Sequence, residues 1–390
     1  MSICLNDLGV VCAIGQSKEA VFNALLSGSD ESLVLDCELP IEQAQYVGKV
    51  TLPDTNVLNE IPTRNNKLAY LAYQQIEPTL KPLIARYGHE RVAVVIGTST
   101  AGTFEGELAR KELANTGQYP ESFHYEIQEM AAPANFIASL CQASGPVYSI
   151  STACSSSGKA FVSGKGLLES GLVDVVVVGG VDSLTHLTVN GFESLASVSQ
   201  QKCQPFSKDR DGINIGEAAA LFVMTKEKSG IQMLGAGETS DAYHMSAPEP
   251  NGEGAFLAMK LALKNAGLTG TQIDYVNLHG TGTIKNDDME AKAMHQACGN
   301  NVLCGSTKGL TGHTLGAAGA LEVGICWLLL SEYNSENYIP ANISNQEIDD
   351  TLPALKFSLG VNVDSLTTCM SNSFAFGGNN FSMVLGKADE

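Results

Sequence analysis

The sequence predicts an α/β protein built from two similar halves. Continuous apolar runs at residues 91–97 and 174–180 are typical of strands that are covered on both faces of a sheet. Segments with the apolar spacing of helices alternate with such runs, and the same rhythm resumes after a polar stretch at 225–230. We therefore expect an N-terminal half at 1–225 and a C-terminal half at 226–390.

The composition is that of a globular protein and excludes several classes of partner. The 390 residues carry a formal net charge of −19, with no broad basic stripe that could neutralise the phosphates of a nucleic acid. No run of 18 apolar residues occurs, so we expect no membrane span. The ten cysteines include no C-x-x-C pair and no basic leader opens the chain, which favours free thiols in a cytoplasmic protein over disulfides or a zinc site.

The elements of the first half follow from apolar periodicity. Residues 102–130 are polar and irregular, and we expect loops with one helix there. We expect helices at 17–26, 66–83 and 132–142, and strands at 3–14 (with a turn), 91–97, 146–150 (buried), 174–180 and 215–224.

The second half is interpreted in the same way. The residues from 367 to 385 should form two strands around a loop at 374–380. We expect helices at 254–266, 287–297 and 315–330, and strands at 231–236, 273–278 and 302–306.

Cys154 lies at a predicted strand-to-helix turn, between the strand at 146–150 and a helical pattern that includes Ala160 and Phe161. The free N–H groups of a first helical turn and the positive end of the helix dipole favour an anion. We therefore expect a lowered pKa for the Cys154 thiol and a nucleophilic thiolate near neutral pH. Ala153 and three serines leave room for a substrate. A buried, inert cysteine is the alternative.

Two histidines and a lysine also follow predicted strands. His279 comes directly after the strand at 273–278, and Lys308 and His313 follow the strand at 302–306. Sites in α/β sheets form at such strand ends. Each histidine alone is more often a hydrogen-bonded core residue. With Cys154 they form a Cys-His-His set, which indicates nucleophilic catalysis without a metal.

The motifs around these residues resemble those of elongating β-ketoacyl-acyl-carrier-protein synthases, the condensing enzymes of the thiolase superfamily. They occur in family order over nearly the whole chain. The matching segments are the Cys154 turn, P-F-S-K-D-R-D-G-I-N-I-G-E at 205–217, S-D-A-Y-H-M-S-A-P at 240–248, H-G-T-G-T-I-K-N-D-D-M-E-A at 279–291, K-G-L-T-G-H-T-L-G-A-A-G at 308–319 and N-S-F-A-F-G-G-N-N at 372–380.

The resemblance implies a fold and a reaction. The fold would be the duplicated thiolase-like fold, with two βαβαβ-type halves in a layered αβαβα core. Cys154 would take an acyl group from the phosphopantetheine arm of an acyl-carrier protein. Malonyl-carrier protein would then lose carbon dioxide and attack the thioester, to give a 3-oxoacyl chain two carbons longer. No bound cofactor is implied. The divergent opening of the chain leaves fatty acid synthesis and a specialised polyene or polyketide pathway both open.

The resemblance also assigns roles in the reaction. The backbone N–H groups of Cys154 and Phe376 would form an oxyanion hole for the loading step. His279 and His313, as neutral imidazoles, would donate through Nε2 to the enolate oxygen of the malonyl unit. Lys308 would support both histidines electrostatically.

Three further residues have supporting roles by resemblance. Glu322 resembles the ion-pair partner of the family lysine, since a buried charge requires a partner. Thr281 and Thr283 are candidates to hydrogen-bond the pantetheine arm. Hydrogen bonds within their own turn are an equally open interpretation.

Three rival functions are weighed against this one. A degradative thiolase would use a second cysteine in a C-x-G-x-G loop, and Cys369 is not followed by that pattern. An initiating synthase would pair its cysteine with one histidine and an asparagine. A non-catalytic partner subunit that sets chain length would lack the cysteine. The usual dimer of the family could be a homodimer here or a heterodimer with a related subunit.

Two features of the sequence concern the carrier protein and the gate. The loop at 374–380 places Phe376 at the position of the family's gating aromatic. Ala375 replaces the usual glycine, and we expect it to restrict the gate if its φ is positive. An acidic carrier protein should dock on a local basic patch in a salt-sensitive way, with Arg64, Lys67, Lys202, Lys208 and Arg210 as candidates.

Overall fold

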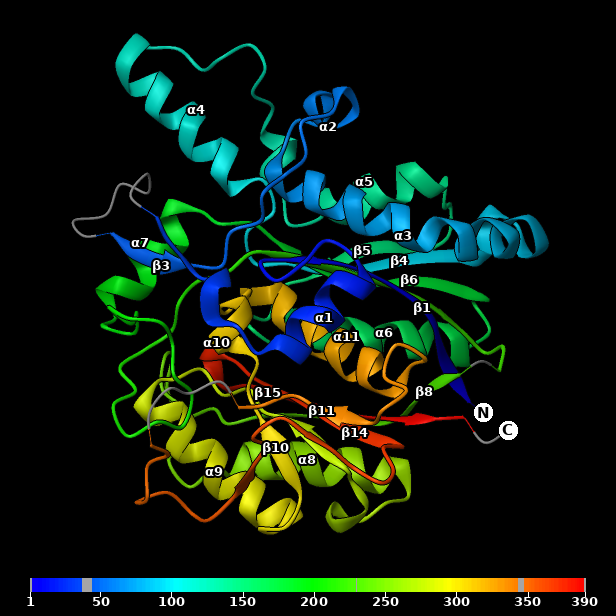
Figure 1. The fold of residues 1–390 in the computed structure, drawn as a ribbon. Coiled ribbons are helices and arrows are strands. Elements are labelled where there is room, and N and C mark those ends of the chain that lie inside the picture. The colour runs from blue at the N-terminus through cyan, green and yellow to red at the C-terminus, as the bar shows by residue number, and fades with distance from the viewer. Residues whose placement is uncertain (1, 37–43, 229, 343–346, 389–390) are drawn as a thin grey trace.

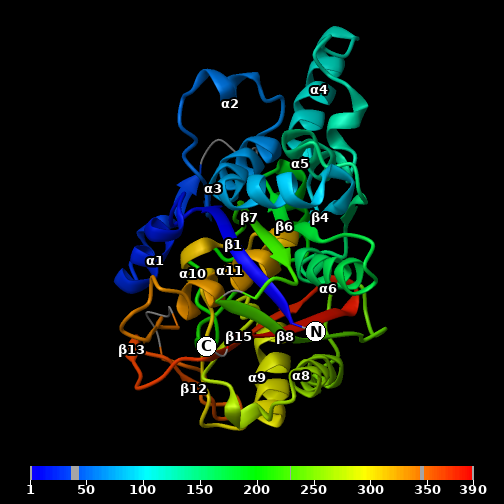
Figure 2. The same ribbon diagram turned by 90° about the vertical axis from the view of Figure 1, so that its right-hand side faces the viewer.

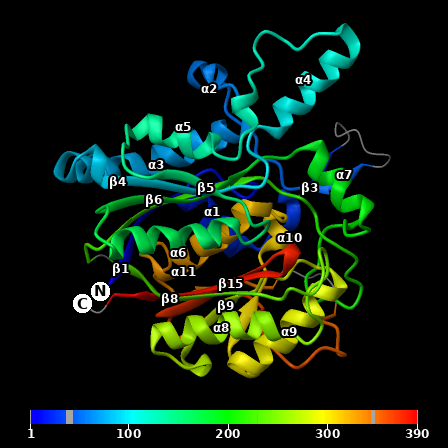
Figure 3. The ribbon, with the colours of Figure 1, turned by 180° about the vertical axis from the view of Figure 1, so that it is seen from behind.

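The computed structural model describes residues 2–36, 44–228, 230–342 and 347–388. Helices and sheets alternate in five layers, helix–sheet–helix–sheet–helix (Figure 1). The views from the side and from behind show the same layers (Figures 2 and 3). The predicted layered α/β core is confirmed.

The first sheet carries its strands in the order β5-β4-β6-β7-β1, and β7 is antiparallel to both of its neighbours. Helices α3 and α5 cover the outer face of this sheet (Figure 1). The bounds are β1 (Ile3–Cys12), β4 (Val92–Gly97), β5 (Val147–Ile150), β6 (Val175–Asp182), β7 (Ala218–Thr225), α3 (Arg64–Tyr87) and α5 (Ala132–Cys141).

The second sheet repeats this order as β10-β9-β14-β15-β8, and the short strand β12 (Lys356–Phe357) extends it beyond β10. Helices α8 and α9 cover its outer face. In both halves the first strand lies beside the last, and the third strand lies at the far end. The bounds are β8 (Ile231–Ser240), β9 (Tyr275–Asn277), β10 (Leu303–Gly305), β14 (Thr368–Phe374), β15 (Asn379–Lys387), α8 (Glu253–Ala266) and α9 (Ile284–Cys298).

The shared strand order reveals a duplication that identity between the half-sequences is too weak to show. Strands β1 and β8 pair over only two residues, Ile3 with Met233 and Cys4 with Gln232. This short ladder joins the two sheets at one edge. We keep 1–225 and 226–390 as a proposed division of the chain.

Helices α6 (Ser156–Glu169) and α11 (Ala318–Leu330) form the middle layer and contact strands of both sheets (Figure 3). Every residue of α11 is buried, which explains why its sequence is apolar on all sides. Small residues permit the close packing, because a Cβ on Gly319 would lie 2.8 Å from the backbone nitrogen of Gly158. The small residues after His313 therefore serve the packing that the sequence predicted.

The remaining elements lie around this core. Helix α4 projects from the body beside α7 (Figure 1). These elements are α1 (Lys18–Ser27), α2 (Asn56–Glu60), α4 (Thr103–Thr116), α7 (His186–Ser194), α10 (Lys308–Thr311), β2 (Val34–Asp36), β3 (Gln45–Val47), β11 (Tyr338–Ile339) and β13 (Val361–Asn362).

Several predicted strands differ from the observed ones at their ends, and two differences concern burial and the candidate site. The strand predicted at 146–150 as buried is only half-buried, because among the described strands β5 is the last of its sheet and pairs with β4 alone. Strand β7 begins at Ala218 rather than at 215, because Ile215 instead forms a bridge with His313. The bridge between Ile215 and His313 helps to hold His313, a predicted site residue, in position.

Two findings concern the environment of the protein. Within the described ranges, no helix combines the length and the apolar character that crossing a lipid bilayer requires. Nine of the ten cysteines lie in the described part of the chain, and all nine are buried free thiols.

Candidate active site

Cys154 lies in the turn between β5 and α6, as the sequence predicts. Ala153 has a φ of 52°, a left-handed conformation that costs a non-glycine residue roughly 1–2 kcal/mol. Ser156 stabilises the turn, since its hydroxyl donates to the Ala153 carbonyl at 2.5 Å and accepts from the Thr152 N–H at 2.8 Å. The thiol of Cys154 is thereby held at the first turn of α6, with 4% of the residue exposed.

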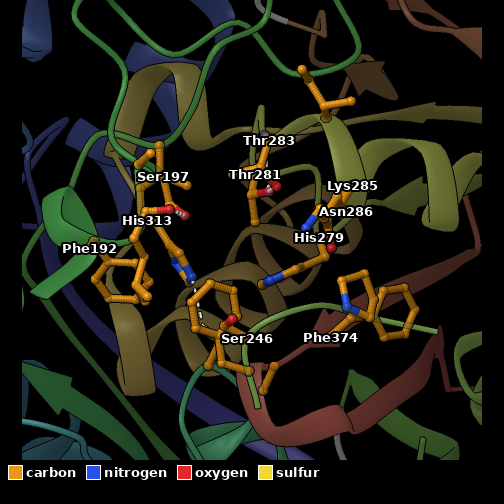
Figure 4. Close-up of a pocket in the computed structure, with 18 of the residues that line it drawn as sticks. Phe192, Ser197, Ser246, His279, Thr281, Thr283, Lys285, Asn286, His313 and Phe374 are labelled. Atoms are coloured by element: carbon orange, nitrogen blue, oxygen red, sulfur yellow. Dashed lines mark hydrogen bonds between the residues drawn. The ribbon is translucent and has the colours of Figure 1, made fainter. Parts of the chain in front are cut away.

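Both predicted histidines converge on this thiol. Nε2 of His313 lies 3.0 Å from Sγ of Cys154. His279 approaches from β9, with its ring centroid 5.3 Å from that of His313 at an interplanar angle of 84°. The two side chains enter the cavity from opposite sides (Figure 4). All three residues are at least 96% buried, so their chemistry takes place away from bulk water.

Lys308 lies behind His279 and fixes its tautomer. Its ammonium group faces three acceptors, which are a carboxylate oxygen of Glu322, the carbonyl of His279 and Nδ1 of His279 at 3.3 Å. A lysine has only donors, so Nδ1 of His279 accepts and Nε2 carries the proton. His279 therefore presents an N–H donor to the cavity. The predicted partnership of Lys308 with Glu322 is found, with both side chains buried.

Burial sets the protonation states of these groups. It lowers the pKa of both His279 and His313 well below the usual value, and the charge of Lys308 lowers them further. Burial raises the pKa of Glu322, and Lys308 opposes that rise. Both imidazoles are therefore neutral near pH 7, and each can donate through the one nitrogen that carries its proton.

The expected low pKa of Cys154 is not found. Burial raises the pKa of this thiol to about 11, while Lys308 and the backbone N–H groups of Phe376 and Cys154 act to lower it. Desolvation of the anion therefore outweighs the favourable helix terminus. The resting pair is a thiol beside the neutral imidazole of His313, which can take up the thiol proton through Nε2.

Phe376 lies in the short 3-10 turn Phe376–Gly378, between β14 and β15. Its backbone N–H and that of Cys154 both lie close enough to Sγ to lower the pKa of the thiol. Its ring packs against Phe192 of α7, with 5.3 Å between centroids. Phe376 therefore lies beside the sulfur and at the wall of the cavity, and its role in an oxyanion hole stays a prediction.

Ala375 does not carry the strain that the sequence suggested. Its φ is −101°, a conformation open to any residue, and the positive φ values fall on Gly377 (82°) and Gly378 (80°). The expected restriction of the gate by alanine therefore has no basis in this conformation. Asn379 carries a different constraint, because Nζ of Lys159 donates to its Oδ1 at 3.0 Å.

A cavity of about 270 Å³ leads from the surface to the reactive groups. Thr281 and Thr283 line it, but their hydroxyls also bond each other at 2.9 Å (Figure 4). The hydrogen bond within the turn is therefore found, and binding of the pantetheine arm by these threonines stays a prediction. The other lining residues are Cys154, Phe192, Leu195, Ala196, Ser197, Asp211, Ile213, Asp241, Ser246, Pro248, His279, Ile284, Lys285, Asn286, His313, Phe374, Ala375, Phe376 and Asn380.

Glu290 supports the site, and the sequence analysis did not single it out. This fully buried carboxylate accepts the N–H groups of His279 and Gly280, each at 2.7 Å. It holds the turn after β9 and so aims the His279 ring. Glu290 falls within the matched motif at 279–291, eleven residues after His279. Its buried face on α9 is the signal that could have identified it.

A second support holds the loop of His313. Its N–H donates to the Asn214 carbonyl at 2.7 Å, and its carbonyl accepts from the Gly216 N–H at 2.9 Å. A Cβ on Gly216 would lie 2.4 Å from the Thr311 carbonyl oxygen. Glycine at 216 is therefore required for the strand-like contact that positions His313.

The ligand atoms of Cys154, His279 and His313 all lie within 4.8 Å of one another, close enough to share a metal ion. In the described part of the chain, no other three His, Cys, Asp or Glu residues meet this condition. The ammonium of Lys308 beside Nδ1 of His279 opposes a cation at that point. The geometry thus suits acyl chemistry better than metal binding.

Two of the five predicted docking residues are internal ion-pair partners. Arg64 bonds Glu217, whose carboxylate is fully buried, and Nη2 of Arg64 also donates to the Val50 carbonyl at 2.7 Å. Arg210 is 6% exposed and pairs with Asp288 at 2.6 Å and with Asp349 at 2.7 Å. Both guanidinium groups are engaged in internal ion pairs, with 3% of the Arg210 side chain and 21% of the Arg64 side chain exposed, so docking by Arg210 is disfavoured and docking by Arg64 stays a prediction.

The three lysines of the predicted patch are more accessible. Lys208 is exposed and Lys67 is half-buried. Nζ of Lys202 lies 5.9 Å from the centroid of the Tyr46 ring. These three stay candidates for contact with a carrier protein.

Arg64→Met should destabilise the protein rather than weaken docking. The substitution leaves the buried Glu217 carboxylate without its cation, which typically costs about 3–5 kcal/mol in the free energy of unfolding. Urea unfolding should show this loss. The control Lys208→Met, on the surface, should change stability by less than about 0.5 kcal/mol. Unchanged stability with weakened carrier binding would instead confirm Arg64 as a docking residue.

Comparisons with known proteins agree with this geometry. The family model described as the β-ketoacyl synthase N-terminal domain matches residues 81–229, and the model for the C-terminal domain matches residues 231–344. An alignment of 413 positions with 3-oxoacyl-acyl-carrier-protein synthase 2 of Synechocystis sp. shows 32% identity and covers 99% of this chain and 98% of that protein. It is 31% identical over 317 residues to the protein of the same name from Staphylococcus aureus, covering 76% and 75% of the two chains.

Solved structures include close matches. One is a chain of the complex between the ketosynthase ApeO and its chain length factor ApeC from Xenorhabdus doucetiae, with a TM-score of 0.93, 43% identity and coverage of 99% of this chain and 98% of that chain. Another is a β-ketoacyl synthase from Burkholderia phymatum, with a TM-score of 0.88 and 23% identity over the whole of both chains, which shows the shared fold.

Proposed function

The chain belongs to the β-ketoacyl synthase family, and from that premise we propose that it catalyses a decarboxylative Claisen condensation. An acyl chain held as a thioester on Cys154 is joined to the malonyl unit of an acyl-carrier protein to give 3-oxoacyl-carrier protein. The observation that carries the proposal is the contact of 3.0 Å between Sγ of Cys154 and Nε2 of His313. His279 lies beside this pair, and Nζ of Lys308 is 3.3 Å from Nδ1 of His279. The substrates arrive on phosphopantetheine, and the reaction uses no bound cofactor.

The loading step uses the Cys154 side of the site. Sγ attacks the carbonyl carbon of the acyl thioester while His313 takes the thiol proton at Nε2. The N–H groups of Cys154 and Phe376 stabilise the tetrahedral oxyanion. The intermediate collapses with release of the pantetheine thiol, which receives the proton from His313. The acyl group is then covalently bound to Sγ.

The condensation step uses the histidine side of the site. Loss of carbon dioxide from the malonyl unit leaves an enolate, whose oxygen accepts the Nε2–H of His279. His313 has given its Nε2 proton to the pantetheine thiol, so it becomes the second donor after its remaining proton moves from Nδ1 to Nε2. The carbanion carbon attacks the acyl carbon, the C–S bond to Cys154 breaks, and the sulfur leaves as a thiolate. The buried setting protects the carbanion from protonation by water.

The alternative of a non-catalytic partner subunit is disfavoured by the intact site. Cys154, His279, His313 and Lys308 are all present and in mutual contact, which a subunit that only shapes product length does not require. A thiolase is also disfavoured, because Cys369, its candidate second cysteine, is fully buried within β14.

We infer that the active form pairs with a second subunit of related fold. The matched structure with 43% identity is a complex of a ketosynthase with its chain length factor, which supports a heterodimer and a specialised pathway. Within the described ranges, strand β5 pairs with β4 on one side and has no partner strand on the other, so its half-buried edge is where a second subunit could add. Size-exclusion chromatography with light scattering, with and without a co-expressed related subunit, distinguishes the homodimer from the heterodimer.

Incubation with acyl-carrier protein tests the proposed reaction. Intact-protein mass spectrometry should show one acyl adduct, and tryptic mapping should place it on Cys154. Subsequent addition of malonyl-carrier protein should release the adduct as a 3-oxoacyl product with evolution of carbon dioxide. A protein that gains no adduct from any carrier-bound acyl chain, alone or with its partner subunit, would be the non-catalytic subunit instead.

A further inference from the structure

Two separate elements bring backbone donors to the sulfur of Cys154. The N–H of Cys154 belongs to the turn that leads into α6, whereas the N–H of Phe376 belongs to the turn between β14 and β15, and each acts to lower the pKa of the thiol. The two turns lie far apart in the sequence, so the covalent chain does not fix the distance between them. The relative position of the two donors therefore depends on contacts between α6 and the Phe376 turn.

Apolar packing brings α6 against β15 (Figure 3). Gly158 of α6 lies against Phe381 of β15, since a Cβ on this glycine would lie 2.4 Å from Cδ1 of the Phe381 ring. Apolar contact is not directional, so it holds the two elements together without fixing how one is shifted or rotated against the other. A precise position for the Phe376 donor requires a directional contact as well.

Lys159, the next residue of α6, supplies such a contact. Its Nζ donates to Oδ1 of Asn379 at 3.0 Å, and the lysine side chain is 18% exposed. A carboxylate oxygen of Glu238 in β8 lies 4.0 Å from the same Nζ, so the ammonium charge has a partner of opposite sign. A hydrogen bond from an ionised donor is shorter and stronger than one between neutral groups, and low exposure to solvent preserves that strength.

Asn379 connects this contact to the Phe376 turn. Its carbonyl accepts the N–H of Ala375 at 2.7 Å, which closes the turn at its base. Its side chain lies beside the turn, because a Cβ on Gly377 would be 3.8 Å from Nδ2 of Asn379. The turn is also held by a different loop, through the N–H of Gly377 and the carbonyl of Met245 at 2.9 Å. The hydrogen bond with Lys159 thus joins the turn to the helix that follows Cys154.

We propose that Lys159 and Asn379 are positioning residues, whose hydrogen bond holds the N–H of Phe376 beside the sulfur of Cys154. Neither is among the described residues that line the cavity, so both act through the Phe376 turn rather than on the substrate. The effect on the resting thiol does not depend on which reaction the protein catalyses. The effect on acyl loading rests on the function proposed above.

Alkylation of Cys154 by iodoacetamide tests the proposal without any carrier protein. Lys159→Met and Asn379→Leu each remove the hydrogen bond and keep a side chain of similar size. At about pH 8 each should slow alkylation of Cys154 roughly threefold to tenfold, because the thiolate loses stabilisation by the N–H of Phe376. Tryptic mapping reports Cys154 separately from the other cysteines. The matched control is Lys165→Met, since Lys165 pairs with Glu169 on the same helix, and this variant should keep the parent rate.

Two further variants separate positioning from a general loss of structure. Asn379→Asp keeps an oxygen acceptor for Lys159 and should be alkylated at a rate close to that of the parent. The double variant Lys159→Met/Asn379→Leu should lose no more than either single variant, because both substitutions break the same contact. In acyl loading, each single variant should lower kcat about tenfold and leave the KM of the acyl donor unchanged, as displacement of a donor near the reacting atoms does.

Unchanged or faster alkylation of Cys154 in Lys159→Met and Asn379→Leu would overturn the proposal, as would losses that add in the double variant. A lower urea midpoint with the parent rate of alkylation would assign the pair to stability alone and would equally overturn it. Failure of the proposed function has a different signature, because a parent protein that is alkylated at Cys154 but gains no acyl adduct lacks the reaction. The alkylation rates then still decide whether Lys159 and Asn379 position the Phe376 donor.

Discussion

Cys154→Ala should abolish acyl loading while leaving the fold intact. The substitution removes the sulfur that forms the thioester, and the described residues that line the cavity include no second cysteine. The residues beside Cys154 are small, and the side chain that contacts its sulfur is that of His313, so the loss of the thiol disturbs little of the packing. Mass spectrometry should therefore show no adduct at concentrations and times at which the parent is fully acylated, a loss of at least about 10³-fold in loading rate.

The matched control for this variant is Cys141→Ala. Cys141 lies in α5, is 4% exposed like Cys154, and has a pKa that burial also raises. Its replacement should leave loading unchanged and should affect only stability. Decarboxylation of malonyl-carrier protein should persist in Cys154→Ala, because the histidine side of the site is intact. A Cys154→Ala protein that still condensed acyl and malonyl units at the parent rate would show that the nucleophile lies elsewhere.

Apolar periodicity was sufficient to locate most elements of the core, because both sheets are covered on two faces and their strands are continuous apolar runs. The same rule misjudged β5, whose composition is apolar although it lies at the edge of its sheet. Position in a sheet depends on long-range pairing, and a single strand sequence does not encode it. The duplication likewise became visible only as a shared strand order.

The reactive residues were predictable because each one follows a strand, whereas their environment was not. Arg64 and Glu217 are 153 residues apart in sequence, so nothing local indicated that this arginine is internal. The pKa of Cys154 depended on whether desolvation or the helix terminus dominates, and burial decides that question. The turn after β14 has two residues with positive φ, and these are Gly377 and Gly378 rather than Ala375. The sequence alone did not indicate which positions of the turn would have positive φ.

The two histidines differ in ways that separate their roles. Nδ1 of His279 faces Lys308, which leaves Nε2–H as a fixed donor, while Nε2 of His313 contacts the thiol. Because burial lowers the pKa of His279 well below 6.5, the folded protein keeps this imidazole neutral as pH falls through that value, whereas the unfolded chain takes up a proton. His279 therefore makes the folded state less stable as pH falls below about 6.5, and has no such effect above it.

His279→Ala should slow decarboxylation of malonyl-carrier protein by about 10²–10³-fold, the usual cost of one lost oxyanion donor, and should change acyl loading little. His313→Ala should impair both steps, because its Nε2 also serves the thiol of Cys154. His295→Ala, on the exposed side of α9, is the control and should affect neither step. Release of labelled carbon dioxide reports decarboxylation, and the rate of adduct formation on Cys154 reports loading. Since the donor form of His279 is already neutral, its protonation should not limit decarboxylation between pH 8 and about pH 6, where Glu290 and Glu322 titrate because burial raises the pKa of each to about 7. An equal loss of both steps in His279→Ala would contradict the assignment of His279 as a neutral donor to the enolate.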